Sequence, residues 1–353
     1  MSNFFLRLNQ IFTFLTLVCY VNVFISPNDF WLAGFLALLI PFLQFSHLFF
    51  IIFWIFLKNY WKSAYSVAIL LIGAVFFNAT FALSFGSNEK TDFSVLSYNV
   101  RVFNLYDHLN QHFKSSQKMI DWAKNSSAEI KCFQEFYQQK DSKIFNTIQQ
   151  IKEKGTPNVF FQKTVANYIG GEFGLAIFSK FPIINKGEIV FTNKSFNNAI
   201  FADLLVGKDT IRVYNVHLQS MSIDEKSVAH TDSLQKNIWN LSRRLKKGFI
   251  ARALQIDKIT EHIKNCPYRI IFCSDLNDLP YSYTYFSLKK LLKNAFEESA
   301  NGFEFSYNGK LFFLRIDNQF FSEGLQALHY ETQKEMHESD HFPIKVDFSL
   351  EMP

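Results

Sequence analysis

Three long apolar runs occupy the start of this 353-residue chain, at residues 11–25, 30–57 and 64–85. Each approaches or meets the roughly 17–25 residues that a helix needs to cross the hydrocarbon core of a bilayer. None shows the polar face at a 3.6-residue period that marks a helix packed on one side of a soluble core. The runs therefore predict an N-terminal helical membrane region over residues 1–86, with about three transmembrane helices.

Two details of this region stay open. The middle run is long enough to span once with tilt, or to form a re-entrant pair broken near Pro41. A cleaved signal peptide would account for the first run but not for the two that follow it.

Basic residues in the short loops predict the orientation. Arg7 precedes the first run and Lys58 and Lys62 separate the second from the third, whereas residues 26–29, between the first two runs, include no basic residue. Because cytoplasmic loops are enriched in Lys and Arg, the N-terminus and the Lys58–Lys62 loop are expected in the cytoplasm. We therefore expect a multi-pass protein of the cell inner membrane, whose remaining chain lies on the extracytoplasmic (periplasmic) side.

The chain changes character after a short polar linker at residues 87–92. From Phe93 onward, strand patterns alternate with amphipathic helices, and the roughly 260 residues of 93–353 suffice for one sizeable α/β or α+β domain. The formal net charge of +5 is compatible with nucleic acid, phospholipid or phosphate esters as partners and does not choose among them. The four cysteines show no Cys-x-x-Cys spacing, which argues against a disulfide scaffold or a cysteine metal site.

A carboxylate and a carboxamide end one apolar strand. Residues 269–273 are typical of a buried strand, and Asp275 and Asn277 follow it two residues apart. Side chains at spacing two in a strand point to one face, so both aim at one spot beyond the strand end. The pair suits one group acting on a metal or water and its neighbour on a phosphate oxygen. An Asx-rich turn that closes the strand is the alternative explanation.

Other predicted strands end in compatible side chains. Asn99 and Arg101 share a face near the end of one strand, where Asn can orient a metal-bound water and Arg can clamp a phosphate. Glu135, at the end of a second strand, is a plausible single carboxylate ligand for Mg²⁺. On a third, Asn215 and His217 again share one face. The strand pattern at 174–183 is interpreted as structural.

The last cluster combines two segments. Residues 312–317 are predicted to form a strand that ends in Asp317, and the adjacent Asp340 and His341 lie in the loop before the final strand, 344–348. Because neighbouring side chains diverge, Asp340 could face a metal while His341 faces the attacking water. Asp317 could hold the imidazole, a pairing that fixes the tautomer and raises its basicity.

Taken together, these motifs resemble the endonuclease/exonuclease/phosphatase superfamily, which includes deoxyribonuclease I, the apurinic endonucleases, inositol polyphosphate 5-phosphatases and neutral sphingomyelinases. The resemblance covers residues 93–350, and the membrane region is similar to that of membrane-attached bacterial members. The motifs that carry it are, in chain order, Asn99, Gln134–Glu135, Asn215-x-His217, Ser274-Asp275-x-Asn277, Arg315-Ile316-Asp317 and Ser339-Asp340-His341-x-Pro343.

The resemblance implies a fold and a cofactor. The fold is a four-layer α/β (α+β) sandwich of two packed β-sheets flanked by helices, with the catalytic site at one end. The cofactor is Mg²⁺ or Mn²⁺. Glu135 would be the principal metal ligand with Asn99 beside it, and Asp340 would lie at the metal side.

The resemblance also assigns catalytic roles. Asp275 would orient or deprotonate the attacking water, and Asn277 would contact the phosphate. His341, steadied by Asp317, would be the base or charge partner, and His217 would contact the phosphate or assist the leaving oxygen. Arg101 and Asn215 are expected to bind substrate; the Arg departs from the apurinic endonucleases, which have an acid at that place.

The substrate stays open at this point. A phosphodiesterase acting on nucleic acid is one hypothesis, and a phospholipid phosphodiesterase of the sphingomyelinase kind is another. A non-catalytic membrane-anchored binding protein of the same fold is the third. The lipid bilayer is an expected partner, and no obligate protein partner is inferred.

A basic segment, residues 243–252, precedes a predicted helix at 253–264. It is either a solvated helix face or a contact for anionic lipid headgroups or a nucleic-acid backbone. Apolar residues among and beside its charges, Trp239, Leu245, Phe249 and Ile250, favour the membrane surface.

Overall fold

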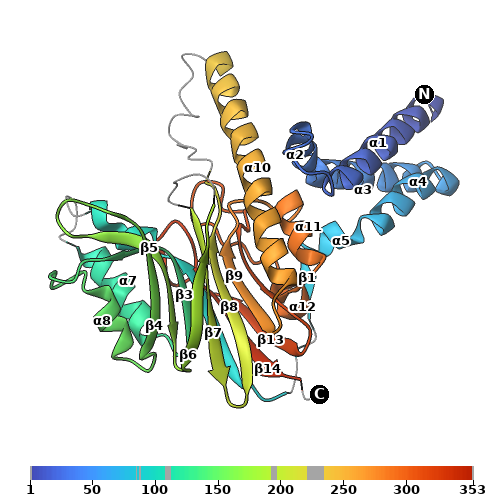
Figure 1. Cartoon of the computed structure of the whole chain (residues 1–353). Coiled ribbons are helices and arrows are strands. Elements are labelled where there is room, and N and C mark those ends of the chain that lie inside the picture. The colour runs from blue at the N-terminus through green and yellow to red at the C-terminus, as the bar shows by residue number, and fades with distance from the viewer. Residues whose placement is uncertain are drawn as a thin grey trace. The chain divides into compact units, whose positions relative to one another are not determined.

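The computed structural model describes residues 2–84, 86, 89–107, 113–191, 197–220 and 234–351. They form two compact units, which we call the helical unit and the sheet unit (Figure 1). The helical unit comprises residues 1–80, 221–254 and 280–287, and the sheet unit comprises 81–220, 255–279 and 288–353. The predicted linker at 87–92 lies partly outside the described residues.

The helical unit contains the apolar runs as helices. Two stretches, Ser2–Asn22 and Leu32–Phe56, are by length and composition able to cross a membrane or, near the N-terminus, to serve as a signal sequence. The third run is divided at Gly73 into two helices that are each shorter than a span, so the number of spans stays a prediction. The helices of this region are α1 (Ser2–Asn22), α2 (Leu32–Ala37), α3 (Ile40–Phe56), α4 (Tyr60–Ile72) and α5 (Ala74–Asn78).

The polar residues inside the apolar runs join three of these helices. Oγ1 of Thr16 in α1 lies 2.9 Å from Nε2 of His47 in α3, whose Nδ1 lies 3.0 Å from Oγ of Ser66 in α4. Ser66 in turn donates to Oδ1 of Asn9 at 2.8 Å. All four side chains are fully buried. Such a network satisfies polar groups in an apolar setting and fixes which helix faces meet.

The sheet unit is built on two six-stranded mixed sheets. The first has the order β13–β14–β2–β3–β5–β4, and the second has the order β10–β12–β9–β8–β7–β6. Parallel pairing joins β2 to β3 and β8 to β9, whereas the remaining pairs are antiparallel. The strands of the first sheet are β2 (Phe93–Asn99), β3 (Ile130–Gln138), β4 (Asn158–Ala166), β5 (Glu172–Ser179), β13 (Leu325–Thr332) and β14 (Ile344–Leu350). Those of the second are β6 (Ile183–Ile189), β7 (Asn198–Val206), β8 (Asp209–His217), β9 (Arg269–Asp275), β10 (Lys293–Asn294) and β12 (Asp317–Phe321).

Shorter elements complete the unit. A small pair, β1 (Ala82–Leu83) and β11 (Asn301–Gly302), lies outside the two sheets. The helical elements are η1 (Arg101–Asp107), α7 (Lys114–Asn125), α8 (Thr147–Lys152), α10 (Leu234–Lys264), α11 (Tyr283–Lys289) and α12 (Ala295–Ser299). The first part of α10 and most of α11 belong to the helical unit.

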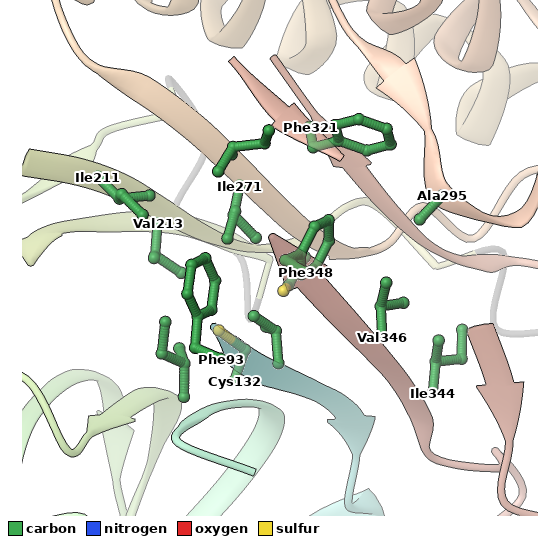
Figure 2. Close-up of a cluster of buried hydrophobic side chains, with 14 of the residues drawn as sticks. Phe93, Cys132, Ile211, Val213, Ile271, Ala295, Phe321, Ile344, Val346 and Phe348 are labelled. Atoms are coloured by element: carbon green, nitrogen blue, oxygen red, sulfur yellow. The ribbon is translucent and has the colours of Figure 1, made fainter. Parts of the chain in front are cut away.

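The main core lies between the two sheets (Figure 2). In β2, Phe93 and Val95 point into this core, while Leu96 and Tyr98 point to the other side of the first sheet. This alternation is the period of two that a strand imposes, with both faces buried. Side chains at the ends of the strands on the inner face therefore meet between the sheets.

Helices cover both outer faces. Met119 and Ile120 of α7, with Ile151 of α8, pack on the first sheet. On the second, the C-terminal part of α10 places His262 against Phe201 and 2.9 Å from the hydroxyl of Tyr214. The expected four-layer sandwich with flanking helices is confirmed.

Two predicted elements differ from the structure. Residues 312–317 do not form a strand that ends in Asp317; Leu311–Leu314 is a turn closed by a backbone hydrogen bond, and β12 begins at Asp317. The cause is pairing, because β12 aligns Asp317 with Asp275 of β9. The helix predicted for 253–264 begins instead at Leu234 and includes the basic segment, whose Arg, Lys, Leu and Ala residues are good helix formers.

Candidate active site

The predicted site residues gather where the inner faces of the two sheets end. Asn99 ends β2, His217 ends β8 and Asp275 ends β9. Asp317 begins the antiparallel β12, so it lies at the same edge as Asp275. The segments predicted from strand ends therefore lie together in the structure, but Asp317 is at the beginning of its strand and not at the end.

A β-bulge turns Glu135 toward this edge. In the pairing of β3 with β5, Phe133 faces Ala176 but Phe136 faces Gly174, so the register shifts between them. Both phenylalanines lie on the helix-facing side, and without the shift Glu135 would share that side with Phe133. The backbone of Glu135 has φ of +49°, an uncommon value for a residue with a Cβ. The bulge is thus what makes Glu135 available to the site.

Asn99 bridges the two carboxylates. Its Nδ2 donates to Oε1 of Glu135 at 3.2 Å and to Oδ2 of Asp275 at 2.9 Å. Its Oδ1 accepts the backbone N–H of Arg101. In this arrangement the amide nitrogen, rather than the oxygen, faces the carboxylates, so Asn99 orients Glu135 and Asp275 as a hydrogen-bond donor.

The imidazole of His217 faces the same two carboxylates. Its Nε2 lies 3.7 Å from Oε1 of Glu135 and 3.6 Å from Oδ2 of Asp275. Among the residues that the structure describes, none forms a hydrogen bond with this nitrogen, although it is buried. A buried polar nitrogen aimed at two acids is suited to contact a bound group such as a phosphate.

Asp275 is fully buried and held in place by the turn that follows it. Its Oδ1 accepts the backbone N–H of Asn277 at 2.9 Å, so the Asx turn considered from the sequence is present together with the site geometry. Asn277 has φ of +49°, and its Nδ2 donates to the carbonyl of Leu218. Strained backbone at Glu135 and Asn277 is typical of functional sites.

His341 lies between two carboxylates. Its Nδ1 is 2.8 Å from Oδ2 of Asp317, and its Nε2 is 3.9 Å from Oδ2 of Asp275. Burial disfavours the imidazolium, but the charges of Asp317 and Asp275 outweigh burial and raise the pKa of His341 well above its usual value. The predicted Asp317–His341 contact is therefore present, with Asp275 on the other side of the ring.

Arg101 and Asp340 lie beside this group. Nε of Arg101 is 3.7 Å from Oδ2 of Asp340, and both side chains are well exposed, at 50% and 38%. An exposed guanidinium at the rim is suited to bind an anionic substrate. In this structure the carboxylate of Asp340 pairs with Arg101. Its expected role as a metal ligand stays a prediction.

Asn215 lies deeper than a substrate contact would. It shares the inner face of β8 with His217 but is fully buried, and its Nδ2 donates to the carbonyls of Phe133 and Ala176, both at 2.9 Å. Its Oδ1 accepts a hydrogen bond of 2.7 Å from Gln134. Asn215 therefore ties the second sheet to the bulge that carries Glu135, so this geometry favours a positioning role over the expected substrate contact.

Asn215→Ala should lower the free energy of unfolding by about 2–4 kcal/mol, because two buried carbonyls lose their donor. It should also lower turnover, since the bulge at Glu135 is no longer fixed. Urea denaturation and a phosphodiester assay on the full-length chain in detergent measure both effects. Asn185→Ala, which removes an exposed amide that donates to Asp203, is the control and should change little. Unchanged stability and turnover for Asn215→Ala would contradict this role.

The donor set fits a hard divalent cation. Carboxylate oxygens are the ligands that Mg²⁺ and Mn²⁺ prefer, and Glu135 and Asp275 direct theirs to the same Asn99 nitrogen. A second group, Asp275, Asp317 and His341, has potential ligand atoms within 4.8 Å of one another. In that group Asp317 and His341 already pair with each other, which leaves the Glu135 side as the more open position.

Two serines support the site without having been singled out from the sequence as ligands or catalysts. Oγ of Ser339 donates to the carbonyl of Asn99 at 2.8 Å and accepts the backbone N–H of His341. Oγ of Ser306 accepts the backbone N–H of Asp317 at 3.0 Å. Ser339 belongs to the motif around His341, whereas no local pattern marks Ser306.

Comparisons with known proteins agree with this geometry. A model of the endonuclease/exonuclease/phosphatase family matches residues 96–341, and a model of a domain of unknown function matches residues 2–80. A search of curated proteins found no matching relative.

Solved structures show the same fold at low identity. An endonuclease/exonuclease/phosphatase from Beutenbergia cavernae is 12% identical with a TM-score of 0.54, over 74% of this chain and 72% of that one. A mannosyl-6-phosphatase from Bacteroides thetaiotaomicron is 17% identical with a TM-score of 0.51, over 73% and 100%. The catalytic domain of human Nocturnin is 16% identical with a TM-score of 0.50, over 73% and 93%.

Proposed function

Because the chain belongs to the endonuclease/exonuclease/phosphatase family, we propose that it is a membrane-anchored, divalent-metal-dependent hydrolase of phosphoester bonds, of the phosphodiesterase type. The observation that carries the proposal is the convergence of Glu135, Asp275 and His217 on one point, with His341 and Asp317 beside them. Two acids flank an imidazole nitrogen of His217 that forms no hydrogen bond with the residues that the structure describes, an arrangement that suits a cation and a phosphate better than a structural role.

The chemistry divides among the side chains. A Mg²⁺ or Mn²⁺ held by Glu135 would neutralise charge that builds on the phosphate oxygens. Asp275 orients the attacking water and accepts its proton, and the neighbouring Asn277 contacts the phosphate. His217 donates from Nε2 to a phosphate or leaving oxygen. His341, held by Asp317, is the charge partner of Asp275 at the point of attack.

Membrane attachment is supported by the surface of the helical unit. Large apolar side chains are exposed along α1 and α3, among them Phe14 at 70%, Phe42 at 71% and Ile52 at 68%. Contiguous exposed apolar surface of this kind needs a partner such as the bilayer interior. From the loop charges we propose that the anchor lies in the cell inner membrane with the catalytic domain in the periplasm.

Phosphodiester hydrolysis by the full-length chain in detergent is expected to depend on the cation. With bis(p-nitrophenyl) phosphate as substrate, removal of the metal by a chelator should lower turnover by at least about 10²-fold, and added Mg²⁺ or Mn²⁺ should restore it. Turnover that persists in chelator would contradict the proposed mechanism. Absence of turnover with either cation would favour the non-catalytic binding protein instead.

Two substrate classes remain for the same chemistry. The phosphodiester could belong to nucleic acid or to a phospholipid headgroup, and the exposed apolar surface of the helical unit favours a substrate in the membrane. Nicking of plasmid DNA and release of phosphocholine or phosphoethanolamine from liposomes, measured in parallel, separate the two.

A further inference from the structure

The N-terminal half of α10 carries an unusual concentration of positive charge. Residues 234–249 contain five basic side chains and no acidic one, which equals the net charge of +5 of the whole chain. The rest of the chain therefore has no basic excess of its own. The five are Lys236, Arg243, Arg244, Lys246 and Lys247.

Within the helical unit, this half of α10 packs against the start of the apolar stretch Leu32–Phe56. Phe249 is buried and its ring lies 5.3 Å from that of Phe35, edge to face. Gly34 permits the contact, because a Cβ there would lie 2.4 Å from Cδ2 of Phe249. Leu32–Phe56 is one of the two stretches that are long and apolar enough to cross a membrane, and α10 meets it at its N-terminal end.

Two tryptophans lie next to basic side chains here, a combination that is typical of a membrane–water boundary. Nζ of Lys246 lies 4.3 Å from the ring centre of Trp31, the residue just before the apolar stretch. Trp239 is 65% exposed, with the guanidinium of Arg243 5.7 Å from its ring. Trp is enriched at the headgroup level of bilayers, and basic residues beside it reach the phosphates.

We propose that Arg243, Arg244, Lys246 and Lys247 of α10 bind the anionic headgroups of the membrane in which the apolar helices are embedded. The inference rests on the membrane attachment proposed above and is independent of the hydrolytic chemistry. Each basic side chain near an anionic surface strengthens attraction about fivefold. Lipid is favoured over a nucleic-acid backbone because the exposed apolar side chains of Ile238 and Trp239 precede the charges, which lie beside the apolar stretch.

A fluorophore on α10 tests the proposal in the full-length chain. An environment-sensitive dye is attached through Asn240→Cys in a Cys266→Ser background, since the other three cysteines are buried. The protein is placed in nanodiscs of phosphatidylcholine with or without phosphatidylglycerol. We expect a blue-shifted emission and quenching by headgroup-attached nitroxide in the anionic discs, both weakened by salt.

Charge reversal supplies the decisive comparison. The double variant R243E/K247E should lower the headgroup-bound fraction at least about tenfold, because attraction is replaced by repulsion. The matched control K258E/K264E reverses two exposed lysines of the other half of α10 and should leave the signal unchanged.

Three results would overturn the inference. They are an equal signal in phosphatidylcholine alone, no response to R243E/K247E, and a response only to an added oligonucleotide. Failure of the protein to enter nanodiscs at all would instead contradict the membrane attachment on which the inference rests.

Discussion

Asp275→Asn is expected to lower phosphodiester turnover of the full-length chain by roughly 10³–10⁴-fold, the largest effect that we expect from a single substitution. The asparagine keeps the size of the side chain and can still accept the backbone N–H of Asn277. It removes the negative charge that faces His341 and the oxygen that would take the proton of the attacking water. The measurement is the turnover of bis(p-nitrophenyl) phosphate with saturating Mn²⁺.

A second carboxylate provides the control. Asp209 begins β8, at the opposite end from His217, and pairs with Arg269 at 3.2 Å on the surface. Asp209→Asn should leave turnover within about twofold of the unchanged chain, because surface pairs contribute little. Near-normal turnover by Asp275→Asn would remove this carboxylate from the mechanism.

His341→Gln is expected to lower turnover by roughly 10²–10⁴-fold. Glutamine is uncharged, so it cannot supply the positive charge that the imidazole holds between Asp317 and Asp275. Asp317→Asn should produce a similar loss, since the ring then loses its 2.8 Å partner and its orientation. Because the two side chains act as one unit, the double variant should be little worse than either single variant.

A half-buried histidine of the sheet unit is the control for this pair. His262 belongs to α10 and contacts Tyr214 on the outer face of the second sheet, away from the strand ends. His262→Gln should change stability without a comparable change in turnover. Losses from His341→Gln and Asp317→Asn that simply multiply in the double variant would show that the two residues act separately.

Spacing in strands brought the candidate residues together in pairs. Asp275 was expected to share a face with Asn277, and His217 with Asn215, because residues two apart in a strand point to one side. That rule does not predict how far a side chain lies from the end of its strand. Asn215 shares the face of His217 but lies two residues before the strand end, about 6.6 Å deeper, where it meets backbone carbonyls of the first sheet.

Features that depend on pairing between distant strands could not be predicted from the sequence. The register shift that turns Glu135 inward depends on how β3 meets β5, more than thirty residues further along the chain. The placement of Asp317 at the beginning of β12 depends on its alignment with Asp275. The apolar residues Phe312 and Phe313 suggested a buried strand, yet both are exposed in a turn.

Glu135 is expected to hold a divalent cation beside Asp275, and anomalous diffraction from crystals soaked in Mn²⁺ can locate the ion. We expect an anomalous peak next to the carboxylate of Glu135 that disappears in crystals of Glu135→Gln. Mn²⁺ bound only at other positions, or unaffected by that substitution, would show that Glu135 does not hold the metal.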